Sequence, residues 1–305
     1  LDYGYYVVAV PGATLANASG QYATLVSVDS TNVNANIKGD LPTVDKKVQV
    51  NGTGKDATDA KIGDTLNFTL TSTIPDMSAY DTYTFNFKDT LSEGLTFGQV
   101  TSVTVEGVAA PLTEGTDYTV TAPTASNNTL TVAMNDFKAK QQANAGKKIT
   151  VTYTATLNEK AVVGGAGNVN SATIQYSNNP SASGTGESEP SKVRVFTYGF
   201  TVDKYTGDKY ADNATRLAGA EFTLAPKDGG EAIRFVQVNA GNATTNAVYR
   251  VAKAGETGTT TTITTPANGK VVFQGLKNGE YTLTETKAPA GYNKLASAIG
   301  VKVNG

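Results

Sequence analysis

The sequence predicts an all-β protein of tandem Ig-like β-sandwich domains. Short runs of alternating apolar and polar residues recur along the chain, and turn-forming residues separate them. Helical periodicity is confined to one short segment, DFKAKQQANAG at 136–146. Many short strands at regular spacing are typical of sandwiches.

The predicted strands alternate with a two-residue period, which gives each strand one buried and one exposed face. Asn-Gly pairs, KDGG at 227–230 and PAG at 289–291 supply turns between them. The alternating runs lie at 22–28, 64–72, 83–89, 148–157, 171–177, 198–204, 220–224, 270–274, 281–285 and 299–303.

Two polar, turn-rich stretches divide the chain. The first, IKGDLPT, lies at 37–43; the second, SNNPSASGTGESEPSK at 177–192, is either a linker or an exposed loop. We therefore expect three parts: a remnant with linker at 1–40, a sandwich at 41–193 and another at 194–305. The first part is too short for a core of its own, and the chain does not begin with Met. These features suggest a piece of a longer protein.

Composition removes several function classes. The 305 residues include no cysteine and no histidine, which excludes disulfides, thiol nucleophiles, Ser-His-Asp triads and His/Cys zinc sites. A net charge of −2 offers no basic field for nucleic acid. No apolar run approaches the roughly 20 residues of a membrane helix. The sequence calls for no cofactor.

Five polar side chains fall on predicted core faces. The strand period points Lys46, Asp89, Asn170, Lys204 and Glu285 inward, each in line with apolar residues. Burying such groups singly costs free energy, and paired burial is only weakly favourable. For each residue taken alone, the simplest explanation is that it lies at the end of its strand and its side chain reaches solvent, because charged side chains are almost never fully buried.

A chemical explanation is also open. A lysine amine can attack the side-chain amide of asparagine, release ammonia and leave a Lys–Asn isopeptide bond. Burial lowers the pKa of a lysine and raises that of a carboxylic acid, which favours a neutral nucleophile beside a protonated acid. Folding would make the step intramolecular, which accelerates it greatly.

Two stretches resemble a known family. YTLTETKAPAGY at 281–292 resembles the E-box of CnaB-type domains of Gram-positive surface proteins, Y-x-L-x-E-x-x-x-P-x-G-Y, and NGKVVFQGLKNGE before it is typical too. The segment 41–193 is similar to the CnaA-like middle domain of sortase-assembled shaft pilins. Its motifs are VDKKV, FKDTLSEGLTF at 87–97 and NSATIQYSNNP at 170–180.

In the middle domain the resemblance implies a bond between Lys46 and Asn170, with Asp89 as the promoting acid. Lys47 points outward by parity, and Asn168 is a lesser candidate because it shares the parity of Asn170.

In the last domain the resemblance implies Lys204 and the promoting acid Glu285. The family's asparagine lies on a final strand that this sequence does not show, and Asn304 is a weak candidate. We expect the partner beyond the end of the chain.

Shaft pilins carry another lysine before the middle domain, often in a YPKN motif, which sortase joins to the next subunit. In NVNANIKGDLPT at 32–43 Lys38 takes that position, although the Tyr-Pro of the motif is absent. An ordinary solvated linker lysine is the equal alternative.

Two other sites are less favoured. Asp203, Asp208, Asp212 and Asn213 could offer oxygen ligands to calcium, but their spacing does not fit an EF-hand and a solvated acidic loop is the simpler explanation. A glycosidase needs two carboxylates across one cleft, and Asp89 and Glu285 fall in different predicted domains.

The resemblance implies a non-enzymatic backbone subunit of a pilus, extracellular and anchored to the cell wall of a Gram-positive bacterium. Its partners would be neighbouring pilins and a class C sortase. The alternative is an ancillary pilin or adhesin stalk that binds host surface ligands. A secreted enzyme is a third, disfavoured possibility.

Overall fold

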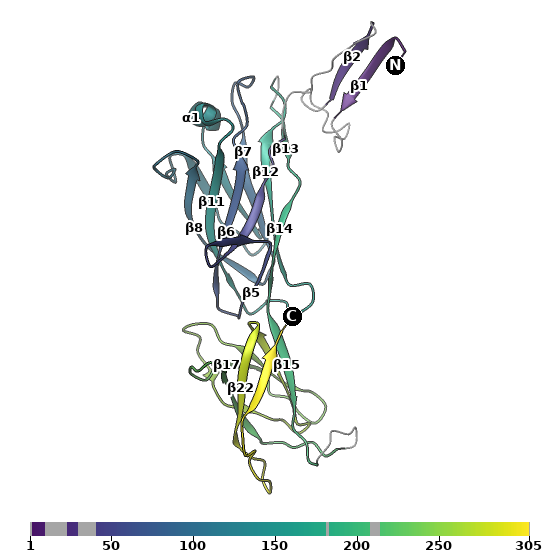
Figure 1. Ribbon diagram of the computed structural model, residues 1–305, viewed down its shortest axis with the longest axis vertical. Coiled ribbons are helices and arrows are strands. Elements are labelled where there is room, and N and C mark those ends of the chain that lie inside the picture. Colours follow the sequence, from purple (N-terminus) through teal and green to yellow (C-terminus); the bar gives the residue numbers. More distant parts are fainter. Residues whose placement is uncertain (1, 10–22, 30–40, 181–182, 208–213, 305) are drawn as a thin grey trace.

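The computed structural model confirms the all-β fold class. It describes residues 2–9, 23–29, 41–180, 183–207 and 214–304. Two β-sandwiches follow one another along the chain (Figure 1). In the described part, no helix has both the length and the apolar character that crossing a membrane requires. An antiparallel hairpin of β1 (Gly4–Ala9) and β2 (Ala23–Val28) precedes the sandwiches.

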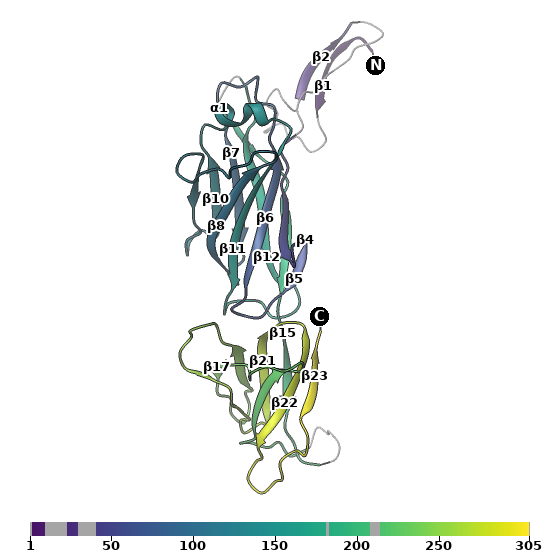
Figure 2. The ribbon, with the colours of Figure 1, turned by 60° about the vertical axis from the view of Figure 1, so that its left-hand side comes forward.

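The first sandwich packs two sheets around one core (Figure 2). One sheet has the order β4-β3-β6-β11-β8, with strands Thr53–Lys55, Asp45–Val50, Thr65–Thr73, Lys148–Leu157 and Leu95–Val105. The other has the order β5-β14-β12-β7-β10-β9, with strands Ala57–Asp59, Ser191–Phe196, Asn168–Ser177, Phe85–Leu91, Thr129–Met134 and Tyr118–Thr121, and β13 (Thr185–Glu187) also pairs with β12.

The predicted helix is present. Residues Phe137–Gln141 form α1, and a 3-10 turn, η1 (Gln142–Asn144), extends it. Phe137 is buried and stacks on Phe85 of β7, with ring centroids 4.5 Å apart. The segment is therefore held by an aromatic contact with the core.

The second sandwich has its own core. One sheet has the order β15-β21-β18-β17-β19, with strands Tyr198–Asp203, Lys270–Leu276, Ala247–Val251, Phe235–Asn239 and Thr259–Thr260. The other has the order β20-β16-β22-β23, with strands Ile263–Thr264, Glu221–Pro226, Gly279–Lys287 and Ile299–Val303. The E-box strand is thus β22, an interior strand of its sheet.

The stretch 177–192 joins β12 to β14 of one sheet, and its residues Thr185–Glu187 form β13, so we propose that it is not a linker between domains. The expected boundary between 193 and 194 falls inside β14, which pairs with β12 and β5. We therefore propose that the division between the sandwiches lies at Thr197, between β14 and β15.

A loop of the first sandwich, residues 59–64, enters the core of the second; we call it the junction loop. Ile62 is 2% exposed and belongs to the second hydrophobic cluster. Its amide donates to the carbonyl of Gly275 (3.0 Å), and a Cβ on Gly275 would lie 2.5 Å from the Ile62 side chain. The glycine lets the loop approach, so a residue from the first sandwich completes the core of the second.

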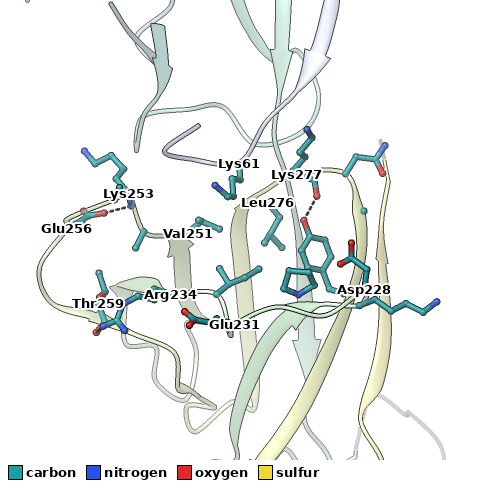
Figure 3. Close-up of a pocket in the computed structure, with 18 of the residues that line it drawn as sticks. Lys61, Asp228, Glu231, Arg234, Val251, Lys253, Glu256, Thr259, Leu276 and Lys277 are labelled. Carbon is teal, nitrogen blue, oxygen red and sulfur yellow. Dashed lines mark hydrogen bonds between the residues drawn. The ribbon is translucent and has the colours of Figure 1, made fainter. Parts of the chain in front are cut away.

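Polar contacts reinforce this junction. The Asn278 amide donates to Asp59 (2.8 Å), and Lys253 forms an ion pair with Glu159 (2.6 Å). Beside these contacts lies an open pocket, lined by Lys61 of the junction loop and by residues of the second sandwich such as Val251 and Leu276 (Figure 3). Covalent continuity through Thr197 is therefore not the sole link between the sandwiches.

Because Ile62 fills part of the second core, Ile62→Ala should lower the stability of the second sandwich by about 2–5 kcal/mol, as expected for a truncated core aliphatic. Hydrogen exchange of the β21 amides under native conditions measures this loss. Val162→Ala is the matched control, because Val162 is 52% exposed. Equal exchange in the two variants would show that the junction loop does not support the second core.

Candidate functional site

Four buried polar side chains meet in the core of the first sandwich. Lys46 on β3 and Tyr153 on β11 come from one sheet, and Asp89 on β7 and Asn170 on β12 come from the other. Each lies on the inward face that its strand period dictates. Lys46, Asp89, Asn170 and Tyr153 are all fully buried. The predicted inward orientation of the first three is thus confirmed.

The Tyr153 hydroxyl connects the other three groups. Its oxygen accepts hydrogen bonds from Lys46 Nζ (2.8 Å) and Asn170 Nδ2 (2.6 Å), and it donates to Asp89 Oδ2 (2.5 Å). Lys46 Nζ also donates to that Asp89 oxygen at 2.5 Å. A phenolic oxygen has two lone pairs and one proton, so these bonds use its full capacity. Both nitrogens of the predicted reaction therefore lie against one oxygen.

Aromatic rings surround the lysine amine. Lys46 Nζ lies 5.2 Å from the Phe68 ring centroid and 5.1 Å from that of Tyr153, and the two rings stack. Burial in these surroundings lowers the pKa of Lys46, although attraction to Asp89 opposes the shift. Burial, followed by the Asp89 charge, raises the pKa of Tyr153 well above its ordinary value. The site thus favours a neutral amine and a protonated phenol.

Two oxygens in this cluster have no hydrogen-bond donor among the residues that the structure describes: Asp89 Oδ1 and Asn170 Oδ1. A buried acceptor without a donor costs free energy. One proton on the carboxyl group would give the cluster the donor that it lacks. The hydrogen bonding of the cluster is therefore incomplete when Lys46 and Asp89 form an ion pair.

The neighbouring candidates have other partners. Lys47 points outward, as its parity predicts, and forms ion pairs with Asp56 (2.7 Å) and Asp45 (3.1 Å). Asn168 is buried, but its amide group bonds the backbone of Val162 and Val195. Its hydrogen bonds hold the 158–167 loop, which is a structural role.

A second pair lies in the second sandwich. Lys204, directly after β15, places Nζ 2.9 Å from Oε1 of Glu285 on β22. The Glu285 side chain is fully buried, while that of Lys204 is 15% exposed. Glu285 Oε2 accepts a hydrogen bond from the Leu295 amide (2.7 Å). The structure therefore brings this predicted lysine and acid together.

Asn304 is not brought to this pair. It is exposed and follows β23, which runs antiparallel to β22 with Gly279 opposite Val303 and Leu283 opposite Ile299. In this register Asn304 lies at the Gly279 end of β22, roughly 20 Å along the strand from Glu285. It is poorly placed to react with Lys204.

Other sequence candidates fall partly or wholly outside the described residues. Lys38 does, as do Asp208, Asp212 and Asn213 of the proposed acidic loop. Asp203 forms an ion pair with Arg216 (2.8 Å). Within the described ranges, no three acidic side chains are grouped closely enough to hold a metal ion.

Sequence reasoning missed Tyr153. Its parity within the 148–157 run does point it inward, but so does that of Tyr83 and Tyr176 in their strands. A tyrosine on a core face is common, because its ring packs among apolar side chains while its hydroxyl hydrogen-bonds to a nearby group. Only the pairing of the two sheets identifies which tyrosine reaches the lysine.

Comparison with known families agrees with the all-β fold. Residues 62–180 match the family described as Gram-positive pilin backbone subunit 2, Cna-B-like domain, where the sequence suggested a CnaA-like one. Residues 203–305 match the prealbumin-like fold domain. The protein is thus of the class that joins Cna-B-like β-sandwich domains in tandem.

Individual relatives are pilus proteins. The chain is 28% identical over 288 residues to the trypsin-resistant surface T6 protein of Streptococcus pyogenes, covering 88% of this chain and 47% of that protein. It is 27% identical over 268 residues to fimbrial subunit type 2 of Actinomyces naeslundii, covering 78% and 46%. It therefore spans about half the length of these relatives.

Among solved structures, the 35 kDa C-terminal fragment of the major pilin GBS80 of Streptococcus agalactiae aligns with a TM-score of 0.65 and 25% identity, covering 86% of this chain and 91% of that one. Together with the family matches, this similarity shows that the chain is homologous to major pilins and carries the Cna-B-like domain of Gram-positive pilin backbone subunits over residues 62–180.

Proposed function

We propose that this protein is a load-bearing shaft subunit of a covalently joined surface pilus, and that an internal Lys46–Asn170 isopeptide bond stabilises it. The buried Lys46–Asp89–Asn170 cluster is the observation that carries this proposal. A fully buried lysine and aspartate contribute little as an ion pair alone, so a chemical role explains their burial better.

The bond forms by exchange of one amide for another. A proton passes from the Lys46 ammonium to Asp89, which leaves a neutral amine and a carboxylic acid. The amine attacks Cγ of Asn170, and the acid donates to the amide oxygen as negative charge develops there. The Cγ–Nδ2 bond then breaks and Nδ2 leaves with an added proton as ammonia. The protein changes once and does not turn over.

The position of Asn170 changes the expected path of tension. A bond between the first and last strands would carry tension past the whole sandwich, but β12 is followed by β13 and β14. The cross-link therefore encloses residues 47–169 and leaves 171–196 outside. The junction loop and Glu159 both lie inside the enclosed segment, so the bond keeps these parts of the first sandwich out of the direct path of tension.

For the second sandwich we propose that Lys204 and Glu285 form the equivalent lysine and acid, with an asparagine that is not Asn304. Their 2.9 Å ion pair and the burial of Glu285 support this. Asn304 lies far from Glu285 along the β22–β23 strand pair. In a protein of residues 1–305 we therefore expect the amine of Lys204 to remain free.

The intact chain should be one ammonia lighter than its sequence, because one isopeptide bond forms. Peptide mapping should recover a branched peptide joining Lys46 to Asn170. Asp89→Ala should have the full sequence mass, since the amine then lacks its acid. An unmodified mass for the unmutated chain would contradict the proposal.

The same pair of proteins tests the stabilising effect. Closing a loop of this length contributes about 5 kcal/mol by the chain-entropy account, which corresponds to roughly 10–20 °C in the Tm of a domain of this size. Glu187→Ala is the control, because Glu187 makes a surface ion pair with Lys88. A Tm for Asp89→Ala equal to that of Glu187→Ala would mean that the bond does not stabilise the fold.

The shaft and adhesin-stalk alternatives differ at Lys38, for which sequence is the sole support. In a shaft subunit, sortase would join Lys38 to the C-terminal threonine of the next subunit. Digests of native pili should then contain peptides that link Lys38 to such a threonine. Lys38 found free in every subunit would favour an ancillary pilin that binds host ligands.

A further inference from the structure

The Tyr153 hydroxyl holds a position that the proposed reaction does not yet use. Its oxygen is within hydrogen-bonding distance of the attacking nitrogen, Lys46 Nζ, and of the leaving nitrogen, Asn170 Nδ2, at 2.8 and 2.6 Å. During amide exchange the first nitrogen must lose a proton and the second must gain one. In the described core, Tyr153 is the side chain that bonds both.

We infer that Tyr153 is a catalytic residue that relays a proton from Lys46 to the leaving nitrogen of Asn170. This inference rests on the proposed isopeptide reaction and adds a proton path to it. Asp89 retains its role as the acid that polarises the amide.

The relay balances in protons and bonds. After the new bond between Nζ and Cγ has formed, Nζ carries one proton too many and passes it to the Tyr153 oxygen along their hydrogen bond. Tyr153 gives its own proton to Nδ2, so the phenol is restored. The Cγ–Nδ2 bond then breaks and ammonia departs. Before the reaction, the Tyr153 hydroxyl donates a hydrogen bond to Asp89. A protonated Asp89 is a weaker acceptor, so the hydroxyl proton of Tyr153 is then free to turn toward Nδ2.

The surroundings suit a relay. Phe68 stacks on the Tyr153 ring at 5.3 Å and Phe97 lies beside it at 6.0 Å, so the hydroxyl is held in place by packing. The raised pKa of Tyr153 means that the phenol keeps its proton in the resting site. It therefore begins the reaction as a donor, and water does not compete because Tyr153 is fully buried.

Tyr153→Phe tests the relay while it retains the ring and its stacking. The proteins are made by cell-free synthesis, and samples taken over time are measured by intact mass spectrometry. The unmutated chain should lose ammonia soon after folding. Tyr153→Phe should do so about 10²-fold or more slowly, the usual size of one general acid–base contribution. Tyr83→Phe is the control, because Tyr83 lies in the same core, outside this cluster.

The outcomes separate the two proposals. If the unmutated chain never loses ammonia, the isopeptide proposal itself fails. If Tyr153→Phe forms the bond as fast as the unmutated chain, the isopeptide proposal stands and the relay is wrong. Should Tyr153→Phe fold poorly, a proton inventory of the unmutated chain decides, in which the rate of ammonia loss is plotted against the deuterium fraction of H₂O–D₂O mixtures. A curved plot fits two protons moving in one step. A linear plot contradicts the relay.

Discussion

The central constraint is a lysine amine fully buried in the core of a β-sandwich. An isolated ammonium ion in such a core costs several kcal/mol, and attraction to one carboxylate barely offsets that cost. Lys46 is fully buried between aromatic rings, and the atoms around it are arranged to take up a proton and to offer an amide. We therefore propose that the cluster is the starting state for bond formation, which would remove the buried charge.

The two lysine sites differ in completeness. Lys46 is fully enclosed and contacts an acid and, through Tyr153, an amide. Lys204 has an acid at 2.9 Å but stays 15% exposed. The backbone of Lys204 is fixed by hydrogen bonds with Gly269 and Leu217, so its placement beside Glu285 is a feature of the fold and not of a mobile tail. In both sites the lysine comes from the beginning of its sandwich and the acid from an interior strand of a facing sheet.

The two-residue strand period alone predicted the inward orientation of most of these side chains correctly. Alternation along a strand fixes which residues face inward, and it pointed Lys46, Asp89, Asn170 and Glu285 to the core faces. Taken singly, each was expected at a strand end open to solvent, but the structure buries all four. It could not identify Tyr153, because the register between distant strands decides which inward side chains touch. For the same reason Ile62 passed unnoticed: a loop residue has no period, and its burial depends on a second sandwich. The boundary expected between 193 and 194 falls inside β14, which pairs with β12 of the first sandwich, and for that reason we propose a later one.

With the proposed bond in place, tension along the chain bypasses the segment enclosed by Lys46 and Asn170. Stretching single molecules by force spectroscopy tests it most directly. With the bond, the first sandwich should lengthen by no more than residues 171–196 allow, about 90 Å when extended. Without it, as in Asp89→Ala, residues 46–196 should release about 500 Å. A release of about 500 Å from the unmutated chain would contradict the claim.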